Sequence, residues 1–247
     1  MSRLENRVAI ITGGAQGIGA AYAKGFASEG ATVVIADIVP NDKLVSDIER
    51  AGGKATFLQT DVTVEDACQT LARRTIDAFG RIDVLVNNAA LWVHVGNKPI
   101  LEISKEEWDR VLNVNINGMF LCTKAVIPQM KSQQYGKIIN ISSGRALKGY
   151  ANLLHYDTSK GAVISFTRSV ARELGDDGIR ANTIAPGGVM TENVLAQEEL
   201  QDLGLGVLAF PKGVVPREKW EENFREVYQL VQSGKSVVTN NPLKFPV

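Results

Sequence analysis

The sequence has few cysteines, no excess of either charge and no long apolar run. Its two cysteines, Cys68 and Cys122, are too few for a disulfide framework, so each is expected to be a reduced thiol on a buried helix face. Basic and acidic residues balance at 27 each, without a basic stripe for nucleic acid or a membrane surface. The start, "MSRLENRVAIITGG", lacks a signal-peptide core, and no run could span a bilayer. We therefore expect a soluble, cytoplasmic protein that binds neither nucleic acid nor membrane.

Signatures of two other kinds of chemistry are also absent. The sequence contains no cluster of His, Cys and carboxylate residues with metal-ligand spacing, so no metal is expected. It contains no G-x-S-x-G elbow, which argues against a hydrolase triad. Without a low-complexity tract or an obvious linker, the 247 residues fit one domain, 1–247.

What is present is a strict alternation of strand and helix patterns. Short, β-branched, apolar runs predict strands at 7–12, 32–37, 55–60, 83–88, 137–142 and 179–186. Helical periodicity falls between them, near 17–29, 42–51, 64–79, 105–131, 155–175 and 217–232. Ser104, with Glu107 three residues later, predicts a capping box for the fourth helix. The alternation predicts an α/β fold with a parallel sheet and helices on both faces, and 187–216 is expected to form a long substrate loop or lid.

The segment "ITGGAQGIGAA" joins the first strand to the first helix. Glycines at 13, 14, 17 and 19 let the backbone turn sharply and approach a pyrophosphate at the helix N-terminus. A glycine-rich turn that binds nothing is the simpler interpretation of this loop taken alone. The second strand, however, ends in Asp37, which can bond both ribose hydroxyls of an adenosine and would repel a 2′-phosphate. No Arg or Lys lies in the loop or just after Asp37, so NAD is predicted rather than NADP.

Further along, "LHYDTSKGAV" places Tyr156 and Lys160 four residues apart, on one face if the segment is helical. Such a pair alone is more typical of an amphipathic surface than of a catalytic site. An ammonium one turn away could also favour the phenolate, and a lowering of about two pKa units needs only roughly 3 kcal/mol. The pair is therefore a candidate for proton transfer if the other parts of a site are present.

Taken in order, these patterns resemble the short-chain dehydrogenase/reductase family. The resemblance spans residues 4–191 and is carried by "TGGAQGIG" (12–19), Asp37, "DVT" (61–63), "NNAA" (87–90), Asn115, Ser143, "YDTSK" (156–160) and "APGGVMT" (185–191). One departure is Ala90, where the family usually has glycine. The resemblance implies a Rossmann-like, doubly wound, three-layer α/β/α domain with the strand order 3-2-1-4-5-6-7. It also implies hydride transfer between a nicotinamide and an alcohol or ketone carbon.

The resemblance assigns roles to individual residues. Tyr156 is the expected general acid/base, Lys160 tunes it and holds the nicotinamide ribose, and Ser143 bonds the substrate oxygen. Asn115 is the expected fourth catalytic residue, whose carboxamide or backbone holds a proton-relay water at a bend in its long helix. The residues expected to contact NAD are Gly13, Gln16, Gly17, Ile18, Gly19, Asp37, Asp61, Val62, Asn88, Ala89, Tyr156, Lys160, Pro186, Gly187, Val189 and Thr191.

The expected substrate pocket is mostly apolar. It combines 91–96, 144–155 and 189–210, and its candidate residues are Trp92, His94, Arg145, Leu153 and Met190. Such a wall suits an uncharged secondary alcohol or ketone with an aryl, alicyclic or medium alkyl body. Arg145 could pair with an acidic substrate group if it pointed inward. His155 adjoins Tyr156 but should face another way on the helix, so it is expected to pack or to shape the pocket.

Two alternatives remain open. A 3-oxoacyl-carrier-protein reductase would need basic residues to dock the acidic carrier, where this chain has Gln134 and Asp177, and such enzymes generally prefer NADPH. A dinucleotide-binding protein without turnover is the second alternative, although all four catalytic positions are intact. The family resemblance weakens over 217–247, where "SVVT" (236–239) is the only candidate for a seventh strand. A homodimer or homotetramer through 105–131 and 155–175 is expected.

Overall fold

The computed structural model describes residues 2–92, 95, 97–187, 189 and 191. Six strands in this part of the chain form one parallel sheet of order β3-β2-β1-β4-β5-β6. The strands are β1 (Val8–Thr12), β2 (Thr32–Asp37), β3 (Lys54–Gln59), β4 (Val84–Asn87), β5 (Gly136–Ile141) and β6 (Ile179–Ile184). The Rossmann-like α/β fold and the order of these six strands are as predicted. The candidate seventh strand and the helix at 217–232 lie outside the described residues.

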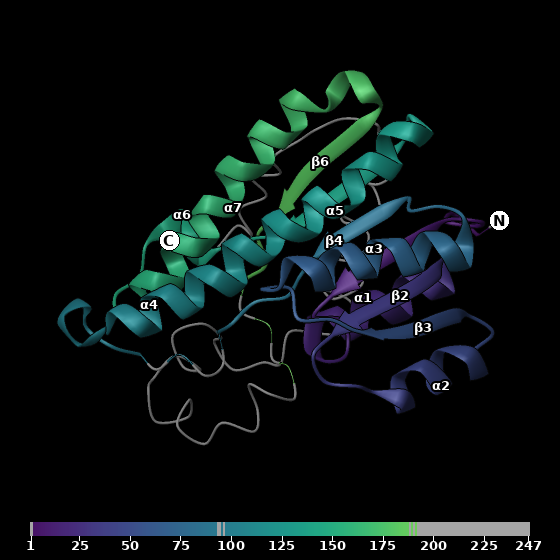
Figure 1. Cartoon of the computed structure of the whole chain (residues 1–247). Helices are drawn as coiled ribbons and strands as arrows, with labels where there is room; N and C mark the ends of the chain where they lie inside the picture. Colours follow the sequence, from purple (N-terminus) through teal and green to yellow (C-terminus); the bar gives the residue numbers. More distant parts are fainter. Residues whose placement is uncertain (1, 93–94, 96, 188, 190, 192–247) are drawn as a thin grey trace, which may run out of the picture.

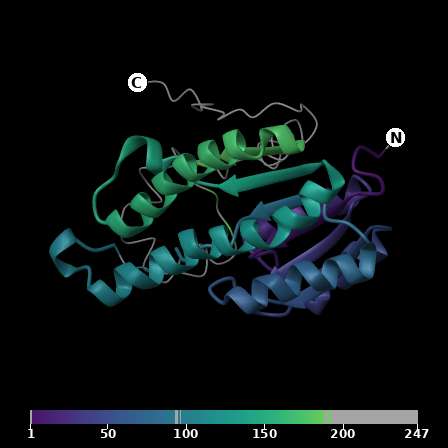
Figure 2. The same ribbon diagram turned by 45° about the horizontal axis from the view of Figure 1, so that its top comes forward.

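Helices cover both faces of the sheet (Figure 1). α1 (Gly17–Ser28) and α2 (Asp42–Arg50) pack on one face, whereas α3 (Glu65–Phe79), α5 (Gly118–Gln133) and α7 (Leu154–Glu173) pack on the other, as Figure 2 also shows. Successive residues of one strand serve different faces: Ile138 joins the core under α3 and α5, and Ile139 joins the core under α1. This alternation explains why the strands read as continuous apolar runs.

The helix predicted at 105–131 is present and contains a π-helical turn at the expected bend. The segment consists of α4 (Lys105–Leu112), a π-helical turn η2 (Asn113–Asn117) and α5. A π turn accommodates an extra residue and shifts the side chains that follow it around the axis, which periodicity over a long window does not reveal. The remaining described elements are short: η1 (Ile100–Glu102), α6 (Arg145–Lys148) and η3 (Gly175–Asp177).

The start of α4 departs from the predicted capping box. Ser104 Oγ accepts from the Glu107 backbone N–H at 3.1 Å, as the box requires. The Glu107 side chain, however, does not return to Ser104; it accepts from Lys98 Nζ at 2.8 Å. Only half of the box forms because Glu107 has other partners.

The two cysteines are free and buried, as predicted, but they also meet. Cys68 on α3 and Cys122 on α5 are 54 positions apart, and their Sγ atoms lie 3.5 Å apart. They help to join the two helices above the sheet. The sequence alone could not predict this contact, because it depends on how α3 and α5 pack. In the described part of the chain, no helix has the length and apolar character needed to cross a membrane.

Candidate active site

The carboxyl ends of the strands bring the predicted site residues to one edge of the sheet. Asp37 ends β2, Asn88 follows β4, Ser143 follows β5 and Pro186 follows β6. In open parallel sheets this edge is where ligands bind, because the chain leaves neighbouring strands toward opposite faces there. The arrangement follows from the strand order alone, before any side chain is considered.

The glycine loop is held by the strand beside it. Asn88 Nδ2 donates to the carbonyl oxygens of Thr12 (3.1 Å) and Gly13 (2.9 Å), and Thr12 Oγ1 accepts from the backbone N–H groups of Asn88 and Ala89. Gly13 has a φ of +59°, and a side chain there would meet the Ala89 backbone at 2.8 Å. Asn88 and Ala89 therefore fix the shape of the loop that is predicted to hold NAD.

The start of α1 suits an anion. Among the described residues no side chain caps this helix, and its first turn contains no acidic residue. The first backbone N–H groups of a helix carry a partial positive charge and bind phosphate oxygens readily. Gln16 precedes the helix and is exposed, Ile18 is partly buried against the core, and Gly19 is buried against Gly13.

Asp37 carries out a structural task as well as the predicted binding role. Its carboxylate accepts from the backbone N–H of Ala15 at 3.0 Å and of Val39 at 3.3 Å, and the residue is 7% exposed. A carboxylate has about four acceptor positions, so two N–H bonds leave room for hydroxyl donors. The residues of this half of the edge thus fit an adenosine ribose and a pyrophosphate.

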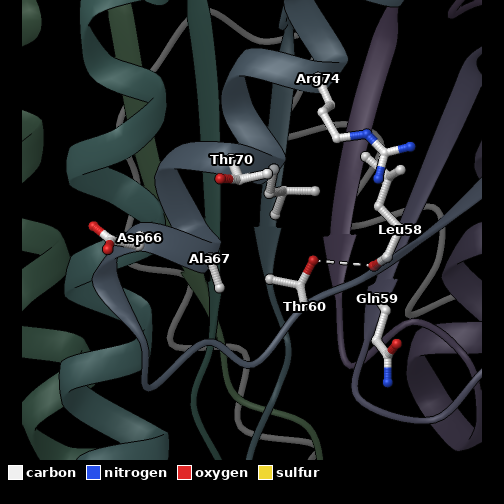
Figure 3. A pocket seen from close by; sticks show the side chains of 8 residues that line it. Leu58, Gln59, Thr60, Asp66, Ala67, Thr70 and Arg74 are labelled. Carbon is white, nitrogen blue, oxygen red and sulfur yellow. Dashed lines mark hydrogen bonds between the residues drawn. The ribbon is translucent and has the colours of Figure 1, made fainter.

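Two more predicted cofactor residues lie after β3. Asp61 is exposed and its Oδ1 accepts from the backbone N–H and the hydroxyl of Thr63, at 2.9 and 2.7 Å. Val62 is buried against Gly118, where an added side chain would come within 2.6 Å of it. A hollow of about 280 Å³ lies beside them (Figure 3), lined by Leu58, Gln59, Thr60, Asp66, Ala67, Thr70, Leu71 and Arg74.

The segment after β6 returns to the glycine loop. The Pro186 carbonyl accepts from Gly144 N–H at 2.8 Å, which ties this segment to the end of β5. Thr191 lies beside Gly17, and a side chain added at Gly17 would meet its methyl group at 3.3 Å. Gly187 is exposed and Val189 is partly buried. The structure therefore brings Thr191 beside the start of α1 and Pro186 beside the segment after β5.

Tyr156 and Lys160 lie on α7 and are both buried, at 8% and 4% exposed. Lys160 Nζ is 5.6 Å from the centre of the Tyr156 ring and donates to the Ile141 carbonyl at 2.8 Å. Burial raises the pKa of Tyr156 to about 12, partly offset by a side-chain hydrogen bond with Ser143 that lowers it. Burial lowers the pKa of Lys160 to about 8. The structure thus places Ser143, Tyr156 and Lys160 in one cluster.

The pKa of Tyr156 is raised in the protein alone, so the proximity of Lys160 does not by itself ionise the phenol. Removing a phenolate from water is unfavourable, and the same burial weakens the hold of Lys160 on its own proton. In the protein alone, the stable state of Tyr156 is the neutral phenol, which is a proton donor. Ionisation at neutral pH therefore needs a further positive charge near the ring.

Asn115 lies in the π turn and is 3% exposed. Its Oδ1 accepts from Leu91 N–H at 2.7 Å, and its Nδ2 donates to the Leu91 carbonyl at 3.3 Å and to Ser159 Oγ at 2.9 Å. Ser159 in turn donates to the Tyr156 carbonyl at 2.7 Å. The carboxamide joins the segment after β4 to η2 and α7 and uses both of its N–H groups to do so, so of the two possibilities for a relay water the backbone is the better one.

The predicted pocket residues fall into four groups. Trp92 contacts Tyr156, with ring centres 5.3 Å apart and planes tilted by 47°. Arg145 instead makes a two-bond ion pair with Asp157, at 2.8 and 3.1 Å, so its charge is already matched. Leu153 is only 2% exposed and packs inside. His94 and Met190 lie outside the described residues.

Sequence reasoning missed several residues that support the cluster. Ser159 and Asp157 were not singled out. Ser142, after β5, also supports the cluster, because its Oγ donates to the Lys160 carbonyl at 2.7 Å. The signal for Ser159 and Asp157 was their spacing on α7: Ser159 is three residues after Tyr156 and Asp157 is three before Lys160, so each shares a helix face with one of them. Groups of three or more His, Cys, Asp or Glu residues that could hold a metal ion are absent from the residues described.

Comparison with known proteins agrees with this geometry. Residues 7–202 match the family model for short chain dehydrogenases. The chain belongs to the short-chain dehydrogenase family. It is 38% identical over 220 residues to a 3-oxoacyl-[acyl-carrier-protein] reductase of Synechocystis, covering 87% of this chain and 88% of that protein.

Two further relatives show how the family varies. A cyclopentanol dehydrogenase of Comamonas is 37% identical over 225 residues, with 88% of each chain covered. Among solved structures, the crystal structure of gox2181 has a TM-score of 0.86 and 30% identity, and the match covers 96% of each chain. Members of this short-chain dehydrogenase family are oxidoreductases that use dinucleotide cofactors, and so the chain is an oxidoreductase.

Proposed function

We propose that this short-chain dehydrogenase transfers a hydride between NAD(H) and an apolar secondary alcohol or ketone, with an aryl-alkyl, alicyclic or medium alkyl body. The observation that carries the proposal is the buried Tyr156 phenol, which is hydrogen-bonded to Ser143 and lies one helical turn from Lys160. A buried proton donor beside a second donor is what a carbonyl oxygen needs as it gains negative charge.

The residues divide the work as follows. Bound NADH would supply the hydride, and NAD⁺ would accept it and place a positive charge in the site. In reduction, Tyr156 Oη gives its proton to the substrate oxygen, while Ser143 Oγ holds that oxygen in place. In oxidation, Tyr156 takes the hydroxyl proton back. Lys160 favours the ionised phenol in this direction, and its ammonium is available because its pKa of about 8 lies above neutrality.

Preference for NAD rests on Asp37. Its buried carboxylate is fixed by Ala15 and Val39, so it cannot turn away from an incoming 2′-phosphate. A phosphate next to a held carboxylate is repelled, while two ribose hydroxyls can donate to it. We infer that NADP binds at least about 10-fold more weakly, equivalent to roughly 1.4 kcal/mol.

The apolar substrate rests on the wall beside the phenol. Trp92 presents an aromatic face next to Tyr156, and the charge of Arg145 is paired with Asp157. An aromatic wall with its neighbouring arginine already paired favours an uncharged ring or chain. The relative named cyclopentanol dehydrogenase supports an alicyclic alcohol as the first substrate to try.

The decisive experiment measures NADH formation or loss with cyclic, aryl-alkyl and medium alkyl secondary alcohols and their ketones. We expect turnover with NAD(H), and a Tyr156→Phe variant should lose roughly 10²–10⁴-fold in kcat while it still binds NADH. Undiminished turnover by Tyr156→Phe would remove the proposed acid/base.

The carrier-protein reductase alternative is tested in the same assay, and two relatives with that name favour including it. An acetoacetyl thioester reduced strongly with NADPH would replace our proposal with this one. Asp177, at one of the two places where a docking cation is expected, is paired with Lys131 at 2.8 Å, which argues against carrier binding there. Tight NADH binding without turnover on any substrate would instead indicate a non-catalytic dinucleotide-binding protein.

We also infer a homodimer or homotetramer through α4, α5 and α7. Support comes from Phe120 on α5, a large aromatic side chain that is 46% exposed and would be covered by such an interface. Light scattering after size exclusion tests this inference, and a monomeric mass at micromolar concentration would contradict it.

A further inference from the structure

A second polar cluster, formed by His155, Glu107 and Lys98, adjoins Tyr156. His155 is fully buried, and its Nδ1 accepts from the backbone N–H of Tyr156 at 2.9 Å. Its Nε2 lies 3.6 Å from Glu107 Oε1 on α4. Glu107 is held by Lys98 Nζ at 2.8 Å, and Lys98 N–H donates to the Asn152 carbonyl just before α7.

The contact at Nδ1 closes the start of α7. The residue before the helix, Leu153, provides no side-chain cap, so the first backbone N–H groups of α7 need other acceptors. His155 Nδ1 serves as that acceptor for Tyr156 itself. The donor is the backbone nitrogen of Tyr156, which is bonded to the Cα of that residue. The hydrogen bond therefore restrains the position of the Cα from which the phenol side chain projects.

The other ring nitrogen, Nε2, faces a carboxylate. A ring nitrogen that accepts from an N–H carries no hydrogen, so the neutral imidazole must carry its hydrogen on Nε2. Nε2 is buried and has no hydrogen-bond partner in the described residues, and the carboxylate of Glu107 is the acceptor that it faces. A shift of roughly 0.5 Å would bring the two atoms to hydrogen-bond distance. The ion pair with Lys98, and secondarily His155, lowers the pKa of Glu107, which keeps that acceptor ionised.

We propose that His155 is a positioning residue for the general acid, and that Glu107 and Lys98 hold it in the Nε2–H form with Nδ1 toward Tyr156. The proposal rests on the proposed function, because it gives Tyr156 the role of acid. The same contacts connect the segment that contains Lys98, which follows Trp92 in the chain, to α7, which carries the phenol. The connection runs from Lys98 to Glu107 on α4 and from there to His155.

Three substitutions separate the two nitrogens. His155→Asn places an acceptor at the δ position and removes the ε position. His155→Gln reaches the ε position without a δ acceptor, and His155→Leu has neither. We expect kcat within about threefold of wild type for Asn and about 10-fold or more lower for Gln and Leu, because small displacements of a catalytic group are costly. NADH affinity should be unchanged in all three.

A control separates positioning from stability. Thr75→Val removes a fully buried hydrogen bond on α3, whose donor is Thr75 Oγ1 and whose acceptor is the Leu71 carbonyl, at 2.8 Å. It should destabilise the fold without changing kcat. The positioning role would be wrong if two results were found together. The first is that kcat of the His155 variants falls in proportion to their melting temperatures, with the same relation as in Thr75→Val. The second is that His155→Asn has no higher kcat than His155→Gln or His155→Leu.

A second readout does not need turnover. The sequence has two histidines, so a long-range ¹H–¹⁵N spectrum at pH 8 contains two imidazoles, and the signal missing in His155→Asn identifies His155. We expect the Nε2–H tautomer. An Nδ1–H tautomer or a doubly protonated ring would overturn the proposal even in an active enzyme. If the Nε2–H tautomer were found but no substrate were turned over, the arrangement of His155 would be confirmed and the proposed function would be refuted.

Discussion

Gly19→Ala tests whether the glycine loop is shaped by close backbone packing. A Cβ at this position of α1 would lie 2.0 Å from the Gly13 carbonyl oxygen and 2.7 Å from Asn88 Nδ2. Real Cβ atoms essentially never come within 3.0 Å of such neighbours, so the loop and the helix must separate by about 1 Å. This movement would also strain the hydrogen bond from Asn88 to Gly13.

The magnitude follows from opposing contributions. Overpacking costs about 1–3 kcal/mol or more, and a weakened hydrogen bond adds about 1 kcal/mol. Alanine in a helix interior recovers about 1 kcal/mol relative to glycine. We therefore expect the free energy of unfolding to fall by about 1–3 kcal/mol, a drop in Tm of roughly 3–10 °C for a domain of this size.

Gly161→Ala is the matched control. Gly161 also lies within a helix, α7, but an added Cβ would meet nothing within 4 Å. The same chemical change should raise stability there by about 0.5–1 kcal/mol. Both variants are compared by denaturant unfolding and by NADH titration. Gly19→Ala should bind NADH at least about 10-fold more weakly, equivalent to roughly 1.4 kcal/mol. Gly161→Ala should bind NADH as tightly as wild type does. Equal stability changes of the same sign would refute the reasoning.

Three other perturbations follow from the site. Because burial lowers the pKa of Lys160 from 10.5 to about 8, its ammonium destabilises the fold by roughly 3 kcal/mol below pH 8, and this penalty disappears between pH 8 and 10.5. The difference in unfolding free energy between wild type and Lys160→Met should therefore shrink across that range. A constant difference would contradict this reasoning. Asp37→Asn should reduce the preference for NADH over NADPH at least about 10-fold in fluorescence titrations, equivalent to roughly 1.4 kcal/mol, whereas unchanged selectivity would remove Asp37 from the cofactor site. Asn115→Ala should lose about 1–3 kcal/mol of stability and most of kcat, because it removes a buried, hydrogen-bonded carboxamide. Asn117→Ala, on the exposed side of the same π turn, should change stability and kcat little. Equal effects of the two substitutions would show that the buried carboxamide has no special role.

The strands and most helices were predictable because burial leaves a periodic signal. A strand covered on both faces is apolar throughout, as in β1, and its ends are marked by glycine or acidic residues. The strand order and the roles of Ser143, Tyr156 and Lys160 came from the family resemblance. Their placement together at the carboxyl edge follows from the parallel sheet, whatever their roles are.

What could not be predicted depends on three-dimensional packing. The π turn at Asn115 has no signature in composition, and the partners of the Asn115 carboxamide come from the loop after β4 and from α7. The pKa of Tyr156 is raised because burial outweighs the lowering effect of its hydrogen bond with Ser143, and the sequence could not show how deeply the phenol is buried. Glu107 was placed in a capping box because its other partners, Lys98 and His155, are not adjacent in sequence.

The contact between Cys68 and Cys122 has a practical consequence for chemical labelling. These are the only cysteines in the sequence, and both are at most 2% exposed. A maleimide reagent applied to the folded protein should therefore find no accessible thiol. A cysteine introduced at an exposed position would be the single reactive site, so dyes or spin labels could be attached one at a time without first removing the native thiols.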